Sequence, residues 1–327
     1  MADPTTTLSW GPHAPTMPDI LSVDEKKRSL YAADVYFSEG YHTLQASSIP
    51  VEDFAQHYSL ILLRPESAVS RKLDNAVDWL QYNGFRIVAA ERVTMDRHSL
   101  RALRYFAWNI TTQERRRIAD HTFTCCQSLV LVLYRKSRRM PTCVELARAK
   151  GPATPELQRP GQLRHHLGSS TALVSHVHTP DEPADIIREL GIFFEEGRRI
   201  RVCESAHAGA DLERFARKQV RKIYEGSEEL DLDYDACVER LLHSVDRFLE
   251  QQPKSRRPAD LGKLAALRAQ LESASAWTDM LRISHRLGVP IHPWDWAVVG
   301  SRVLPMREEG LVTIIGKAES VLAGRGE

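Results

Sequence analysis

Residues 175–190 read SHVHTPDEPADIIREL and indicate where the chain passes from a strand into a helix. The apolar residues of 172–177 predict a strand that delivers His178 into a turn. Two helix starts fit the sequence that follows. Thr179-Pro180-Asp181-Glu182 has the form of a capping box with proline at the first helical position, and Glu182-Pro183 offers a later start. Either start places free backbone N–H groups near the imidazole, which suits an anion such as phosphate, although the pattern alone also fits a helix cap without a ligand.

Apolar runs of strand length recur upstream of this stretch. We predict strands over Tyr58–Leu63, Phe85–Val93 and Leu129–Tyr134, with Ala172–Val177 as the fourth. Between these strands, helical periodicity or a charged pattern predicts helices. They are Val69–Leu80, Asp96–Asp120, Thr142–Lys150 and one that ends near Phe194. A proline- and glycine-bearing loop is expected over Leu157–Gly168. The order predicts an α+β fold, a ferredoxin-like four-stranded antiparallel sheet with helices packed on one face.

The chain divides into three parts around this sheet. Residues 1–57 are expected to form a proline-rich arm, up to about residue 20, followed by a helix over Asp24–Tyr41. Residues 58–196 contain the predicted sheet domain. Residues 197–327 are predicted to form an all-α C-terminal extension, with helices over Asp211–Tyr224, Tyr234–Gln251, Gly262–Leu287 and Glu308–Leu322.

Composition limits the class of protein. The 327 residues carry a net charge of +1 and are 43% hydrophobic and 27% charged, which is typical of a globular chain and unlike one that is basic throughout. The longest apolar run, Leu129–Tyr134, is far too short to cross a bilayer, and the first residues lack the regions of a signal peptide. The cysteine count is odd, and no pair has the C-x-x-C spacing. We expect a soluble cytoplasmic protein with free thiols.

Several motifs in order resemble those of the nucleoside diphosphate kinase family. The stretch at 175–190 resembles the family's active-site pattern N-x-x-H-G-S-D-S-x-E-S-A-x-x-E-I. On that resemblance His178 is the phosphorylated histidine, Asp181 the family aspartate and Glu189 the glutamate that holds the imidazole. Three further motifs lie upstream. Leu63-Arg64-Pro65-Glu66 resembles the family's K-P-D/E, and Gly84-Phe85-Arg86-Ile87-Val88-Ala89-Ala90 resembles G-F-x-I/L-V-A-x. Pro160-Gly161-Gln162-Leu163-Arg164 resembles P-G-T-I-R. The resemblance covers about residues 58–196.

The resemblance implies a phosphotransferase that moves the γ-phosphoryl group of a nucleoside triphosphate through a phosphohistidine. Mg²⁺ would arrive with ATP or another nucleoside triphosphate. A straight helix from Thr179 would place Glu189 roughly 15 Å away, so contact with His178 favours the later helix start at Pro183. The residues implied to bind nucleotide or phosphate are Arg64, Tyr105, Arg148, Thr154, Arg164 and Ser175.

The sequence also departs from the family pattern. Ser175 replaces an asparagine, and Thr179-Pro180 replaces the Gly-Ser after the histidine. The segment Trp108–Arg117 replaces the family's nucleotide clamp, which carries a base-stacking phenylalanine in R-P-F-F. We therefore expect a divergent phosphotransferase whose acceptor need not be a common nucleoside diphosphate. The alternative is a nucleotide-binding pseudo-enzyme with a regulatory or scaffold role.

Two further readings stay open from the residues alone. His176 and His178, with His165-His166 nearby in sequence, have a spacing that can hold zinc. Basic runs could bind nucleic acid, although a solvated face is the favoured account; they are Arg115–Arg117, Arg135–Arg139 and Lys254–Arg257. The family commonly forms hexamers, and the C-terminal extension could block those contacts, so we expect a homodimer. Its partners would be a nucleotide and an unknown phosphoryl acceptor, with no membrane.

Overall fold

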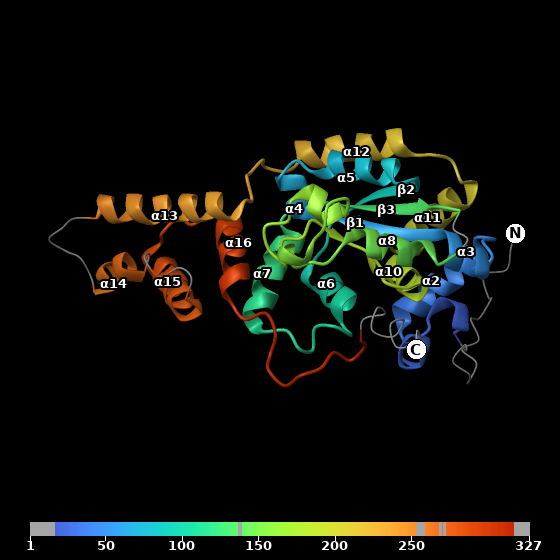
Figure 1. Ribbon diagram of the computed structural model, residues 1–327, viewed down its shortest axis with the longest axis horizontal. Coiled ribbons are helices and arrows are strands. Elements are labelled where there is room, and N and C mark those ends of the chain that lie inside the picture. Colours follow the sequence, from blue (N-terminus) through green and yellow to red (C-terminus); the bar gives the residue numbers. More distant parts are fainter. Residues whose placement is uncertain (1–16, 137–138, 253–258, 268–269, 271–272, 317–327) are drawn as a thin grey trace, which may run out of the picture.

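The computed structural model describes residues 17–136, 139–252, 259–267, 270 and 273–316. Its strands form one four-stranded antiparallel sheet in the order β2-β3-β1-β4, which is the ferredoxin-like order (Figure 1). The strands are β1 (Tyr58–Leu63), β2 (Arg86–Val93), β3 (Ser128–Tyr134) and β4 (Val177–His178). The predicted α+β fold class is confirmed.

Helices cover both faces of the sheet, not one face as predicted. Every residue of β1 is buried, and its side chains alternate between two hydrophobic clusters: Leu60 and Leu62 contribute to one, Ile61 and Leu63 to the other. On the first face lie α2 (Val35–Ala46), α10 (Pro183–Phe193) and α11 (Glu196–Ala208); on the second lie α5 (Leu73–Tyr82) and α12 (Glu213–Glu225) (Figure 1). A sheet with apolar residues on both sides requires this double cover.

Several predicted helices are interrupted by a new N-cap. The predicted helix over 24–41 is two helices, α1 (Glu25–Ala32) and α2, because the Asp34 side chain caps the second. The charged segment 96–120 likewise holds α6 (Arg97–Arg104) and α7 (Gln113–Thr124), capped by Asp96 and Thr112. The remaining helices before β4 are η1 (Asp19–Leu21), α3 (Val51–His57), α4 (Pro65–Val69), α8 (Thr142–Lys150), η2 (Pro155–Leu157) and α9 (Leu163–Leu167).

The fourth strand is much shorter than predicted. The sequence favoured Ala172–Val177, but β4 contains Val177 and His178, paired with Leu63 and Leu62 of β1. His176 has φ 65°, a left-handed conformation that takes the chain out of the sheet. Its carbonyl accepts hydrogen bonds from the Arg64 N–H and the Ser67 hydroxyl at 2.9 and 2.8 Å. The short strand ends with His178 at the sheet edge.

The C-terminal part extends away from the sheet after α12. It contains α13 (Tyr234–Gln251), α14 (Ala259–Leu267), α15 (Ala274–Leu287) and α16 (Pro293–Val303), and α16 packs against α7 (Figure 1). No helix was predicted over 293–303, where His292 serves as N-cap and Pro293 occupies the first position. The helix predicted over 308–322 is wrong for residues 308–316, which are not helical, and residues 317–322 lie outside the described residues. Within the described helices none has the length and apolar character needed to cross a membrane.

Helix α10, which carries Glu189, lies unusually close to α2. A Cβ atom on Gly191 would approach the Tyr36 carbonyl oxygen to 2.2 Å, and one on Gly40 would approach the Ile187 carbonyl oxygen to 2.1 Å. Reciprocal glycines therefore let the two backbones touch. Asp34 at the start of α2 also accepts a hydrogen bond from Arg188 of α10 at 3.1 Å. The N-terminal helices thus fix the position of Glu189.

We expect Gly191→Ala to destabilise the protein by about 1–3 kcal/mol, because the added methyl group forces the two backbones apart. Gly262→Ala on α14 is the matched control, since its Cβ would meet nothing within 4 Å. That variant should be neutral or more stable by up to about 1 kcal/mol. Urea unfolding of the two variants measures the difference, and equal stabilities would contradict the close-packing account.

Candidate active site

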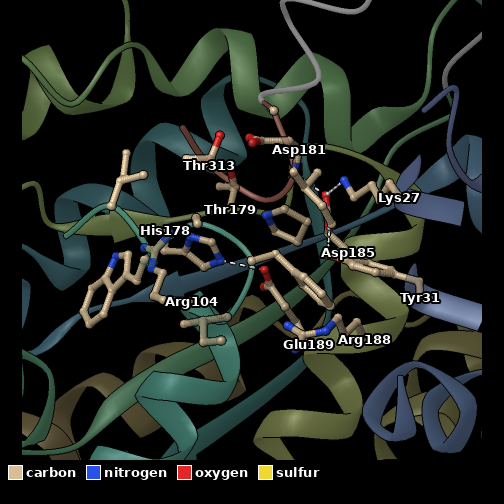
Figure 2. A pocket seen from close by; sticks show the side chains of 18 of the residues that line it. Lys27, Tyr31, Arg104, His178, Thr179, Asp181, Asp185, Arg188, Glu189 and Thr313 are labelled. Atoms are coloured by element: carbon tan, nitrogen blue, oxygen red, sulfur yellow. Dashed lines mark hydrogen bonds and ion pairs between the residues drawn. The ribbon is translucent and has the colours of Figure 1, made fainter. Parts of the chain in front are cut away.

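His178, which is partly buried, and the buried Glu189 form a hydrogen bond at the end of β4. The distance from His178 Nε2 to Glu189 Oε1 is 2.7 Å (Figure 2). Helix α10 begins at Pro183 with Glu182 as its N-cap, which is the later of the two starts that the sequence allowed. The turn over 179–182 reverses the chain, and α10 then carries Glu189 back to the imidazole.

The surroundings keep the imidazole neutral. Burial, reinforced by the positive charges of Arg104 and Lys150, holds the pKa of His178 well below its ordinary value. Burial, followed by the charge of Asp185, raises the pKa of Glu189. One proton satisfies the contact between Nε2 and Oε1, and when it resides on Nε2 the Nδ1 atom keeps its lone pair. Such a ring is a nucleophile.

A cavity of about 260 Å³ opens in front of His178. Its walls come from α6, from the turn before α10 and from the segment after α16, of which Thr313 lies beside Thr179 and Asp181 (Figure 2). Glu189 and Asp181 also line it. The positively charged side chains in its lining are Lys27, Arg104, Arg115, Arg188 and Arg307.

Arg64 and Ser175, two of the predicted phosphate-binding residues, lie together but away from the cavity. The buried Arg64 guanidinium donates to the Ser175 hydroxyl at 3.2 Å and to the Leu173 carbonyl at 3.0 Å. It also pairs with Glu66 at 3.0 Å and stacks on the Phe123 ring, 3.9 Å from its centre. These contacts hold the turn that precedes β4.

The other predicted binding residues do not line the cavity either. Arg164 is buried and donates to the Gly151 and Val177 carbonyls, both at 2.9 Å, so it supports β4 from behind. Tyr105 is 63% exposed, and Arg148 and Thr154 are exposed as well. Of the residues that the sequence analysis named, the structure brings His178, Asp181 and Glu189 to the cavity, and the phosphate roles of the others stay predictions from the resemblance.

Lys150 is a functional candidate that the sequence analysis missed. Its buried ammonium donates to the Thr179 hydroxyl at 2.6 Å, directly after His178 in the chain. Burial, with repulsion from Arg164, lowers the pKa of Lys150 to about 7. A lysine in the last turn of a helix is ordinarily explained by the helix dipole, so its position in the sequence did not mark it. Arg104 was hidden in the same way, in a strongly charged helix, and Arg115 was noted only as part of the basic run 115–117.

A buried ion-pair network joins the N-terminal region to the start of α10. Lys27 of α1 contacts Glu182 at 2.8 Å. It also contacts Asp185 at 2.7 Å, and Tyr31 donates to Asp185 at 2.7 Å (Figure 2). Burial lowers the pKa of Lys27, but the two carboxylates outweigh that effect and raise it. Lys27 therefore stays charged, its charge is balanced by the two carboxylates, and it fixes the turn between His178 and α10.

The described residues hold no group of three histidine, cysteine or acidic side chains placed to bind a metal ion. His176 is buried, with Nε2 3.4 Å from the Gly168 carbonyl, and all five cysteines are free. The basic run at 254–257 and part of the run at 135–139 lie outside the described residues, whereas Arg115 faces the cavity.

Comparisons with known proteins bear on the family of the sheet domain. The family profile for nucleoside diphosphate kinase matches residues 57–198, so this part of the chain forms a domain of that family. No curated protein sequence matches the chain. Its fold is similar to solved structures of nucleoside diphosphate kinases, which cover less than half of it.

One such structure, from Aquifex aeolicus in an orthorhombic crystal form, shares 16% identity, covers 42% of this chain and 94% of its own, and has a TM-score of 0.37. The structure from Pyrobaculum aerophilum shares 17% identity, covers 43% of this chain and 97% of its own, and has a TM-score of 0.36. The Borrelia burgdorferi structure with bound vanadate and ADP shares 16% identity, covers 43% of this chain and 88% of its own, and has a TM-score of 0.34.

Lys150 should make stability depend on pH. Its pKa is about 7 in the folded protein and near 10.5 when unfolded, so between these values the unfolded chain binds more protons. Stability therefore gains up to about 1.4 kcal/mol per pH unit from this residue as pH rises above 7. Urea unfolding at several pH values between 7 and 9 should show a smaller slope for Lys150→Met than for the wild type, and parallel slopes would contradict the assignment.

Proposed function

We propose that this protein transfers the γ-phosphoryl group of a nucleoside triphosphate to an acceptor through a phosphohistidine at His178. The observation that carries the proposal is the His178–Glu189 hydrogen bond at 2.7 Å beside an arginine-lined cavity. A binding pocket alone does not need a buried carboxylate on the second ring nitrogen, whereas a histidine nucleophile does. The family of residues 57–198 supports the same reaction class.

The side chains suggest how each step proceeds. Nδ1 of His178 attacks the γ-phosphorus, a nitrogen–phosphorus bond forms, and the bond to the bridging oxygen breaks so that the nucleoside diphosphate leaves. The ring gains positive charge, which the Glu189 carboxylate at Nε2 stabilises. An acceptor oxygen then attacks the phosphorus of the phosphohistidine, and the nitrogen–phosphorus bond breaks as the oxygen–phosphorus bond forms. The proton of the acceptor passes to solvent, and the ring returns to its neutral form. Arg104 lies beside the nucleophile, where charge develops on the phosphoryl oxygens (Figure 2).

Magnesium fits this site as a companion of the nucleotide. Asp181 presents an exposed carboxylate to the cavity, and Mg²⁺ is commonly held by one or two carboxylates together with substrate phosphates. The ion would neutralise charge on the phosphate chain. Asp181 is the residue of the described cavity lining that could contact it without breaking an ion pair.

The acceptor is proposed to be a specialised one, because the segment between α6 and α7 departs from the family clamp. Trp108 and Ile110 in this segment are buried and line the cavity. Assembly as a homodimer and a cytoplasmic location stay predictions.

The alternative function is a nucleotide-binding pseudo-enzyme. It is favoured by the placement of Arg64, Arg148, Thr154 and Arg164 outside the cavity lining and by Pro180 in place of the family serine. On this alternative, nucleotide binds in the cavity but His178 does not become phosphorylated.

Incubation with γ-labelled ATP and Mg²⁺ should place acid-labile label on the wild-type protein, because phosphohistidine is the expected intermediate. His178→Ala should carry no label. Glu189→Gln should label about 100-fold more slowly, since a neutral amide no longer stabilises the developing imidazolium. Rapid-quench measurement of protein-bound label checks both values.

His165→Ala is the control, because this exposed histidine lies in the same domain and does not line the cavity. It should label as the wild type does. Nucleotide binding by calorimetry without any label on the wild type would sink the enzyme proposal and support the pseudo-enzyme.

A further inference from the structure

The segment after α16 returns to the sheet domain and docks on the α6–α7 region (Figure 1). The Glu308 N–H donates to the Ile110 carbonyl at 2.8 Å, and the Thr112 hydroxyl donates to the Pro305 carbonyl at 2.7 Å. Asn109 contacts the segment twice, through the Val312 carbonyl at 2.7 Å and the Ile314 N–H at 3.2 Å. Contacts at both ends hold residues 305–316, hereafter the return segment, against the cavity.

The return segment adds an arginine to the cavity. Arg307 lines it together with Arg104 of α6 and Arg115 of α7. Arg115 also donates to the carbonyl of Met306 at 3.3 Å, so the two elements are joined next to Arg307. Burial, with repulsion from Arg104 and Arg307, lowers the pKa of Arg115 to about 10. Guanidinium groups from α6, α7 and the return segment therefore line the same cavity.

These three arginines lack a counter-ion in the part of the chain that the structure describes. The nearby cations Lys27 and Arg188 are already paired, with Asp185 and Asp34. No ion pair joins Arg104, Arg115 or Arg307 to a described acidic side chain, and the buried Nε atoms of Arg104 and Arg115 have no hydrogen-bond acceptor. Glu189 is held by His178, which leaves Asp181 as the carboxylate of the described cavity lining that no ion pair occupies. Positive charge thus exceeds negative charge around the cavity.

We propose that Arg104, Arg115 and Arg307 form a binding site for the phosphate chain of the donor, so that the C-terminal extension completes the active site. A phosphate chain supplies several acceptor oxygens, and guanidinium groups bind phosphate bidentately. The cavity of about 260 Å³ is smaller than the roughly 300–1,000 Å³ of pockets that enclose drug-sized ligands, so we expect the nucleoside to lie outside it. The donor role rests on the function proposed above, whereas binding of the phosphate chain does not.

Calorimetric titration of the full chain with inorganic tripolyphosphate tests the site. The wild type should bind one equivalent, and Arg307→Ala should raise the Kd about tenfold through loss of one charge-assisted contact. Arg307 is exposed, so this substitution does not disturb the core. Arg282→Ala on α15 is the matched control, because it removes an exposed arginine of the extension that does not line the cavity. It should bind as the wild type does.

No binding by the wild type, or equal Kd values for the wild type and Arg307→Ala, would overturn the inference, as would equal weakening in Arg282→Ala. The phosphohistidine assay on the same preparations separates this result from the proposed function. If the wild type becomes labelled but the Kd for tripolyphosphate does not depend on Arg307, the proposed anion site is rejected and the phosphotransferase function is retained. If tripolyphosphate binding depends on Arg307 but the wild type acquires no label, the anion site is retained and the phosphotransferase function is rejected.

Discussion

The hydrogen bond between His178 and Glu189 requires two elements, β4 and α10, to be held at a fixed separation. Strand β4 is too short to ensure this alone, since it contributes Val177 and His178 to the sheet. Contacts from outside the family domain supply the constraint. Lys27 fixes the first turn of α10, and the glycine contacts with α2 fix its middle. The N-terminal helices are therefore part of the active-site scaffold.

The positive charge around His178 serves the site at a cost to the fold. Burial and neighbouring arginines keep the imidazole neutral, which a nucleophile needs. Burial is the larger cause of the lowered pKa values of Arg115 and Lys150, and repulsion among these positive charges adds to it. A bound phosphate chain would relieve that repulsion. The cavity is thus organised for an anion before any anion arrives.

How far the sequence predicts this arrangement depends on the range of the interaction involved. The return of Glu189 to His178 follows from the rise of a helix, and the strand at Tyr58–Leu63 follows from local apolar pattern. The fold-back of residues 305–316 and the burial of Arg64 depend on partners more than 100 residues away. Local patterns carry no information about such partners. The predicted phosphate arginines were chosen by family motif, whereas Arg104 and Arg307 of the cavity lining belong to no motif and Arg115 was noted only as part of a basic run.

The central claim is that His178 is a neutral imidazole whose Nε2–H donates to Glu189 and whose Nδ1 is free. Nitrogen NMR of histidine-labelled protein, with His178→Ala to assign the signal, tests it most directly. We predict one tautomer, protonated at Nε2, that does not titrate between pH 6 and 8. A ring that titrates near its ordinary pKa of about 6.5, or a ring protonated at Nδ1, would contradict the account.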